Sequence, residues 1–215
     1  MRFSHLIVVI TAALAAALPA RASTVALAPT ADASFPYACG WSWNYERGCN
    51  WYVGDSLPVG GDVARVWRAA LAFDISRLAP DGEPLSTTLR LWFDGTCVAP
   101  SGVRGPCDGR SWTLAAVPVT SPTWVGQREL ALGDIADLEW LPPFAPPQWV
   151  VFDVSAIVFP WLAGLPNDGL AIKLVDDDEA LLSSGPRFAS SRAANAVVRP
   201  RLEVTYDGGG ALAAP

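Results

Sequence analysis

Proline and glycine interrupt this chain at short intervals and leave little room for long helices. The 215 residues include 19 Pro and 18 Gly, and both residue types end helices and mark turns. Several of the short segments between them alternate in polarity. In the segment Arg65–Ile75, Trp67 and every second residue after it are apolar, whereas Arg68 and Asp74 lie on the opposite face. A period of two predicts β-strands.

Seven such segments predict an all-β fold, a jelly-roll-like antiparallel β-sandwich. A different pattern follows Asp153, where Ile157 and Trp161 are spaced as on one face of a helix and Gly164 can end it. We expect a short helical crossover there, with Asp153 or Ser155 near its start. The expected strands are residues 65–75, 88–94, 111–119, 149–154, 170–175, 187–191 and 201–206.

The first 22 residues have the pattern of an export signal. Arg2 gives a positive start, Leu6–Leu18 is an apolar run of the right length, and small residues precede a cleavage point after Ala22. We expect residues 1–22 to be removed, residues 23–206 to form a single domain, and residues 207–215 to be a flexible tail. The product is then secreted, extracellular or periplasmic, without a membrane span.

Removal of that segment would take away Arg2, Arg21 and His5, the only histidine. Of the 15 Lys and Arg residues 13 remain, against 21 Asp and Glu, so the net charge is −8. A chain without histidine lacks the usual zinc sites and the Ser-His-Asp mechanism, and its acidity disfavours nucleic acids as partners. We therefore expect no enzyme activity. A small secreted polysaccharide lyase or hydrolase that uses carboxylates, Tyr or Arg is a minor alternative.

The four cysteines fall into two closely spaced pairs. Cys39 and Cys49 enclose nine residues, and so do Cys97 and Cys107. In an oxidising compartment four cysteines allow three connectivities, and two local bridges are the simplest of them. We expect two disulfide-clipped surface loops.

Several segments in order along the chain resemble a DNRLRE domain, a grouping that overlaps family 96 of the carbohydrate-binding modules. The most specific are FASSR at residues 188–192 and RPRLEVTY at 199–206. The resemblance implies a jelly-roll β-sandwich in secreted, mostly bacterial proteins, some of which bind acidic polysaccharides such as alginate. The other matching segments are residues 30–32, 68–76, 87–91, 111–112, 123–124, 152–158 with Trp161, and 167–170.

Aromatic and arginine side chains are the candidate ligand-binding residues. Aromatic rings stack on the C–H faces of sugars, and guanidinium groups pair with carboxylates. The alternatives are a small core beneath the first clipped loop, a second sheet over Trp92, and structural ion pairs for the arginines near FASSR. The candidates are Trp41, Trp43, Tyr45 and Trp51 in the loop, Arg90 and Trp92 on one strand face, and Arg187 and Arg192 beside FASSR.

Four carboxylates in a row follow the segment 170–175. Calcium prefers several oxygen ligands, so this run is the one candidate metal site, and a solvated acidic turn is the alternative. Structural calcium is the only cofactor that we consider. The residues concerned are Asp176, Asp177, Asp178 and Glu179.

Together these features lead us to expect a non-catalytic domain that resembles a carbohydrate-binding module. Its partner would be an extracellular or cell-wall polysaccharide, bound through exposed aromatic side chains. The alternative is a structural or protein-interaction component of the cell envelope or extracellular matrix. In that case the aromatic loops would contact another protein.

Overall fold

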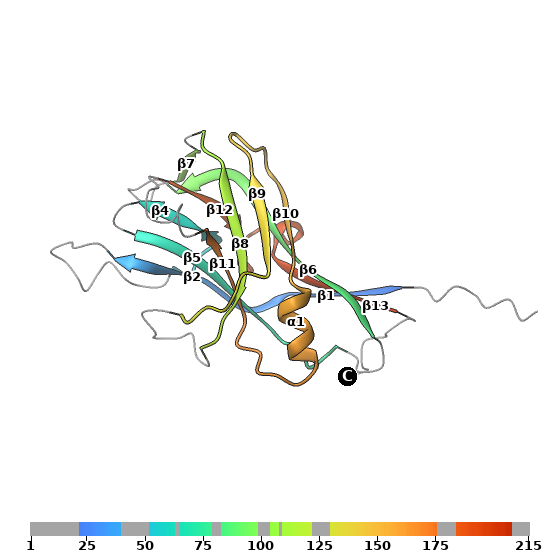
Figure 1. Cartoon of the computed structure of the whole chain (residues 1–215). Coiled ribbons are helices and arrows are strands. Elements are labelled where there is room, and N and C mark those ends of the chain that lie inside the picture. The colour runs from blue at the N-terminus through green and yellow to red at the C-terminus, as the bar shows by residue number, and fades with distance from the viewer. Residues whose placement is uncertain are drawn as a thin grey trace, which may run out of the picture.

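The computed structural model describes residues 22–39, 52–62, 65–78, 83–98, 104–107, 109–121, 130–175 and 184–207. Two antiparallel sheets face each other and curl into a half-barrel (Figure 1), which confirms the predicted all-β sandwich. Sheet A contains β1(Ser23–Leu27), β13(Arg201–Tyr206), β6(Pro84–Val98), β12(Gly185–Ala189), β3(Ser56–Pro58), β10(Gln148–Asp153) and β7(Arg104–Pro106). Sheet B contains β2(Pro29–Cys39), β5(Arg65–Phe73), β11(Leu170–Leu174), β8(Trp112–Pro118), β9(Asp137–Leu141) and β4(Gly60–Asp62).

Each of the seven predicted segments contains or overlaps a strand, and β6 is much longer than its prediction. Its 15 residues form the centre of sheet A, because β13 and β10 pair with its first part and β12 and β7 with its last part. The strands that the sequence did not indicate are β1, β2, β3, β4, β7 and β9.

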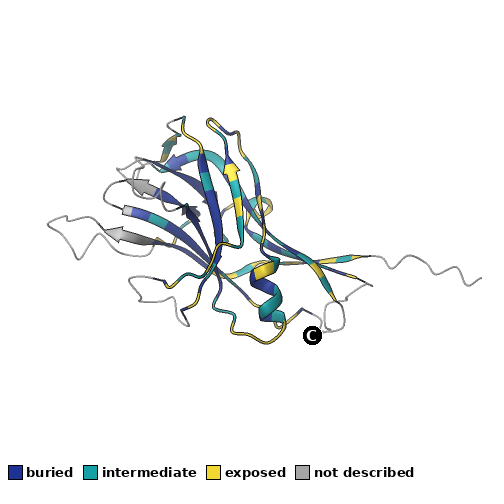
Figure 2. Ribbon diagram, in the orientation of Figure 1, coloured by how far each residue is buried: buried dark blue, intermediate teal, exposed yellow. Residues whose placement is uncertain are grey.

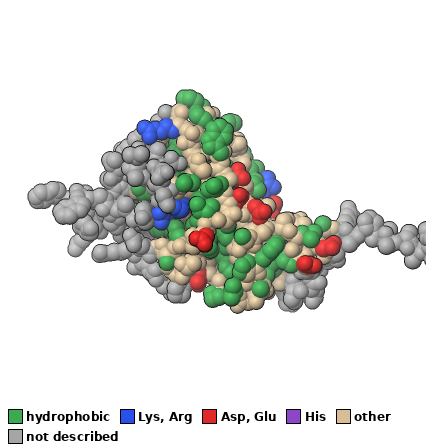
Figure 3. Space-filling view, viewed as in Figure 1, with side chains coloured by type: hydrophobic (Ala, Val, Ile, Leu, Met, Phe, Trp, Pro, Cys, Tyr) green, Lys and Arg blue, Asp and Glu red, His purple; other side chains and the backbone are tan. Residues whose placement is uncertain are grey.

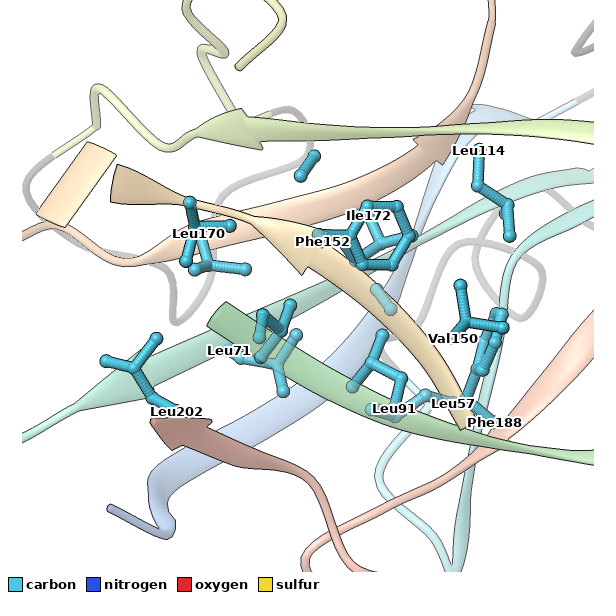
Figure 4. Packing of buried hydrophobic residues seen from close by; sticks show 14 of the residues in the cluster. Leu57, Leu71, Leu91, Leu114, Val150, Phe152, Leu170, Ile172, Phe188 and Leu202 are labelled. Atoms are coloured by element: carbon cyan, nitrogen blue, oxygen red, sulfur yellow. The ribbon is translucent and has the colours of Figure 1, made fainter. Parts of the chain in front are cut away.

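The core lies between the two sheets and is built from alternate residues of their strands. Figure 4 shows Leu91 and Phe152 from sheet A near Leu71, Leu170 and Ile172 from sheet B, and all five side chains are buried. Burial of each side chain of this size contributes about 1.5–3 kcal/mol to folding. This central packing holds the two outer faces in fixed positions.

The central strands of sheet B are buried on both faces, which the alternation in β5 did not predict. Arg68, on the face opposite the core, is only 6% exposed. A second apolar cluster joins Phe35, Ala70 and Ala171 on the sheet to Val119 and Leu130 from the segment that follows β8. The central strands of sheet B are consequently dark blue in Figure 2. Sheet A, by contrast, keeps a partly exposed outer face.

The predicted helical crossover is confirmed as α1(Ser155–Leu162). Both predicted start residues take part, because Asp153 Oδ1 accepts the Ser155 N–H at 2.9 Å and Ser155 Oγ accepts the Thr87 N–H at 2.9 Å. Gly164 follows the helix with φ of 95°, a backbone conformation that glycine adopts without strain. The hydrogen bond from the Thr87 N–H to Ser155 Oγ fixes the start of α1 to β6.

The disulfide between Cys97 and Cys107 is confirmed and joins β6 to the end of β7. Cys49 lies outside the described residues. We expect replacement of Cys97 and Cys107 by alanine to lower the free energy of unfolding by about 2–3 kcal/mol, since the bridge restricts the unfolded chain. Urea unfolding measures the change. A wild-type protein treated with reductant should lose a similar amount, and an unchanged midpoint in both samples would contradict the expectation.

Candidate functional site

The outer face of sheet A brings together charged and aromatic side chains from three strands. Residues of β6 alternate between the core and this outer face, so Arg90 and Trp92 point outward. The strand register places Arg201 of β13 directly opposite Arg90, and Trp149 of β10 directly opposite Trp92. Three segments distant in sequence therefore build one surface.

Trp149 is the centre of this surface. The guanidinium carbons of Arg90 and Arg201 lie 5.3 and 4.8 Å from the centroid of its ring. Trp92 meets the same ring edge-on, with 5.4 Å between centroids and 71° between planes. Both kinds of contact are favourable, by roughly 0.5–1.5 kcal/mol each. We call Arg90, Trp92, Trp149, Arg201 and Glu203 the Trp149 cluster.

One carboxylate serves both arginines of the cluster. Glu203 lies 2.9 Å from Arg201 Nε and 3.5 Å from Arg90 Nη1. Two cations and one anion leave one net positive charge on a strongly acidic chain. Like charges directly opposite each other on neighbouring strands destabilise a sheet. Glu203 offsets part of the repulsion between Arg90 and Arg201, and a bound anion would reduce what remains.

The cluster is ordered yet reachable from solvent. The side chains of Arg90 and Arg201 are 30% and 38% exposed, and both Trp residues are half-buried. The Arg90 Nε atom is buried and makes no hydrogen bond with the part of the chain that is described. Through the exposed parts of Arg90 and Arg201 the cluster can offer guanidinium N–H donors beside apolar ring edges, which suits a ligand with both carboxylate and C–H groups.

Sequence reasoning found two members of the cluster and missed three. Arg90 and Trp92 were predicted, and the structure brings them together on the outer face. Trp149, Arg201 and Glu203 were missed, because their proximity depends on strand register that the sequence pattern does not reveal. Trp41, Trp43, Tyr45, Trp51 and the acidic run Asp176–Glu179 lie outside the described residues. Within the described ranges, no group of three or more His, Cys, Asp or Glu is placed to hold a metal ion.

The two arginines near FASSR contact protein groups elsewhere in the fold. Arg192 Nη1 lies 2.6 Å from Asp32 Oδ1, and Ser191 Oγ donates to the same carboxylate oxygen at 2.8 Å. Arg187 is buried and its Nη2 donates to Ser56 Oγ at 2.5 Å. Arg192 thus forms an ion pair within the fold, and in these interactions neither arginine contacts a residue of the Trp149 cluster.

A second exposed surface lies on edge strand β9 and the turn that follows it. Leu138 and Trp140 on the outer side of β9 are 51% and 63% exposed, and Phe144 in the turn is 78% exposed. We call these three residues the β9 strip. Figure 3 shows hydrophobic side chains at the end of the molecule where Figure 1 places this turn.

Glu139 lies on the opposite side of β9, half-buried toward the core. Burial and the nearby charge of Asp137 raise the pKa of the Glu139 carboxyl above 4.5. A proton is therefore held more tightly in the folded than in the unfolded protein, and stability falls as the pH rises through the folded pKa. We expect Glu139→Gln to raise the thermal midpoint at pH 7.

Thermal unfolding at several pH values measures this effect. The gain of Glu139→Gln over the wild type should shrink as the pH falls toward 4.5. The exposed ion-pair residue Arg77 offers a control, since Arg77→Ala should show no such pH-dependent gain. A Gln variant less stable than the wild type at pH 7 would be the opposite result.

The described part of the chain contains no helix with the length and apolar character needed to cross a membrane. In comparisons with known proteins, no family model matches the chain, and no curated protein does so either. The structure itself shows an all-β sandwich with a partly exposed arginine and tryptophan cluster on the outer face of sheet A.

Proposed function

We propose that this protein is an exported, non-catalytic carbohydrate-binding protein, and that its Trp149 cluster binds an acidic extracellular polysaccharide. One observation carries the proposal. Arg90 and Arg201 lie opposite each other on a partly exposed face, share the single carboxylate of Glu203, and flank Trp149. A uronate unit has the two features that this surface complements, a carboxylate and an apolar C–H face.

The arginines would bind the carboxylate of the sugar. Their remaining N–H groups can donate paired hydrogen bonds, a geometry in which guanidinium is superior to ammonium. The contact of Glu203 with both side chains restricts their rotation, which reduces the entropy lost when a ligand binds. Trp92 and Trp149 would contact the C–H groups of the sugar ring.

The cluster suits binding better than catalysis. Its only carboxylate, Glu203, is already paired with two arginines, whereas a glycosidase needs two carboxyl groups free to exchange protons or attack the sugar. The predicted export signal would bring the protein to extracellular polysaccharide. The resemblance of residues 188–192 and 199–206 to DNRLRE domains agrees with the same ligand class.

Affinity electrophoresis tests the proposal. The purified protein is run through gels that contain alginate, polygalacturonate or neutral xylan. We expect retardation by at least one acidic polymer, weaker at high salt because exposed charges are screened, and little retardation by xylan. Unchanged mobility in all of the gels at low salt would overturn the proposal.

A further inference from the structure

The β9 strip is an exposed apolar surface at one edge of sheet B. The central strands of sheet B are buried on both faces, whereas Leu138 and Trp140 on the outer side of β9 remain largely exposed. Neither Trp140 nor Phe144 is stacked on another ring in the described ranges. Large exposed side chains that gather in this way mark interaction sites on soluble proteins.

The backbone at Phe144 is held in an unfavourable conformation. Its φ is 55°, in the left-handed region that bulky residues avoid, and such a residue costs about 1–3 kcal/mol. The ring lies over Gly109, where an added Cβ would come within 2.6 Å of the Phe144 Cζ atom. Residues with backbone strain of this kind cluster at ligand-binding and other functional sites.

The strip lies beside the Trp149 cluster. β9 and β10 run side by side and are joined by the short turn that contains Phe144 (Figure 1). Near that turn, Trp140 is the second-last residue of β9 and Trp149 the second residue of β10. The acidic residues Asp137 and Asp153, joined by a 2.7 Å hydrogen bond, lie at the other end of the two strands.

We propose that the binding surface continues from the Trp149 cluster around the β9–β10 turn to Trp140 and Phe144, and that it binds one extended sugar chain. This inference rests on the proposed function and deepens it. The arginines would hold an acidic unit, and the two exposed rings would stack on units further along the chain. The sugar would pass from one strand to the other at the turn, away from the repulsive carboxylates of Asp137 and Asp153. Binding affinity must then increase with the length of the sugar chain.

Calorimetric titration with galacturonate and alginate oligosaccharides tests the inference. We expect the octasaccharide of one series to bind more tightly than its disaccharide. Trp140→Ala should weaken binding of the octasaccharide by about tenfold and leave binding of the disaccharide unchanged. Phe144→Gly removes the second ring and relieves the backbone, so it should weaken the octasaccharide without lowering the thermal midpoint. Val197→Ala, a change at an exposed apolar residue on the 3₁₀ helix η1(Ala196–Val198), is the matched control.

The outcomes separate the two proposals. If no oligosaccharide and no acidic polymer binds the wild type, both fail. If the octasaccharide binds, Arg201→Ala weakens it, and Trp140→Ala does not, the extended surface is wrong while the Trp149 cluster stands. A change of oligomeric state in Trp140→Ala, seen by sedimentation, with unchanged sugar affinity would assign the strip to self-association instead and overturn the inference.

Discussion

Replacement of Asp32 by alanine is expected to lower the free energy of unfolding by about 3 kcal/mol. The Asp32 side chain is fully buried and accepts hydrogen bonds from Ser191 N–H, Ser191 Oγ and Arg192 Nη1. Asp32 belongs to β2 of sheet B, whereas Ser191 and Arg192 follow β12 of sheet A. The carboxylate therefore joins the two sheets, and its loss leaves the N–H and hydroxyl groups of the half-buried Ser191 without that acceptor.

Denaturant unfolding monitored by tryptophan fluorescence measures this loss. Arg77→Ala is the matched control, because Arg77 makes an exposed ion pair at 3.8 Å with Asp74, and such pairs contribute at most about 1 kcal/mol. Asp32→Asn retains some acceptor capacity and should lose less than Asp32→Ala. Equal, small effects for Asp32→Ala and Arg77→Ala would show that the contact between the sheets contributes little.

Replacement of both Arg90 and Arg201 by alanine is expected to weaken binding of an acidic polysaccharide by about 100-fold. Two charge-assisted contacts, each of roughly 1.4 kcal/mol, account for this factor. Both side chains are partly exposed, so the fold should persist, and removal of two like charges that lie opposite each other offsets part of the lost packing on Trp149.

Arg104→Ala is the control for charge alone. Arg104 is exposed and pairs with Asp94 at 3.2 Å on the same sheet. The Arg104→Ala variant should bind the acidic polysaccharide with nearly the wild-type affinity at a given ionic strength. An affinity of the double variant equal to that of the wild type would remove the arginines from the binding surface. An equal loss in Arg104→Ala would indicate attraction without a specific site.

The sequence predicted those parts of the fold that depend on local pattern. The alternation in β5 and the spacing of Ile157 and Trp161 identified a strand and a helix, because each pattern marks the residues that face the core. The second buried face of β5 was not visible in that pattern, because Arg68 is polar. In β9 the relation is reversed, since Leu138 and Trp140 face solvent and Glu139 faces inward. A search for apolar residues on a core face could not find that strand.

The candidate site depends on contacts between distant segments. Trp149 meets Trp92 because β10 pairs with β6 in one particular register, and a shift by one residue would separate the rings. Arg192 and Asp32 lie 160 residues apart in the sequence, so no local spacing could join them. The sequence supplied suitable residue types, whereas strand pairing decided which of them share a surface.

The indole N–H signals of Trp92 and Trp149 in an NMR titration with galacturonate and alginate octasaccharides test the central claim most directly. Each tryptophan has one such signal, so the spectrum reports where the sugar binds. We predict that the Trp92 and Trp149 signals of the wild type shift saturably, over the same sugar concentrations at which calorimetry detects binding. In the Arg90→Ala/Arg201→Ala variant these shifts should be absent. Saturable binding that leaves both signals in place would contradict the account.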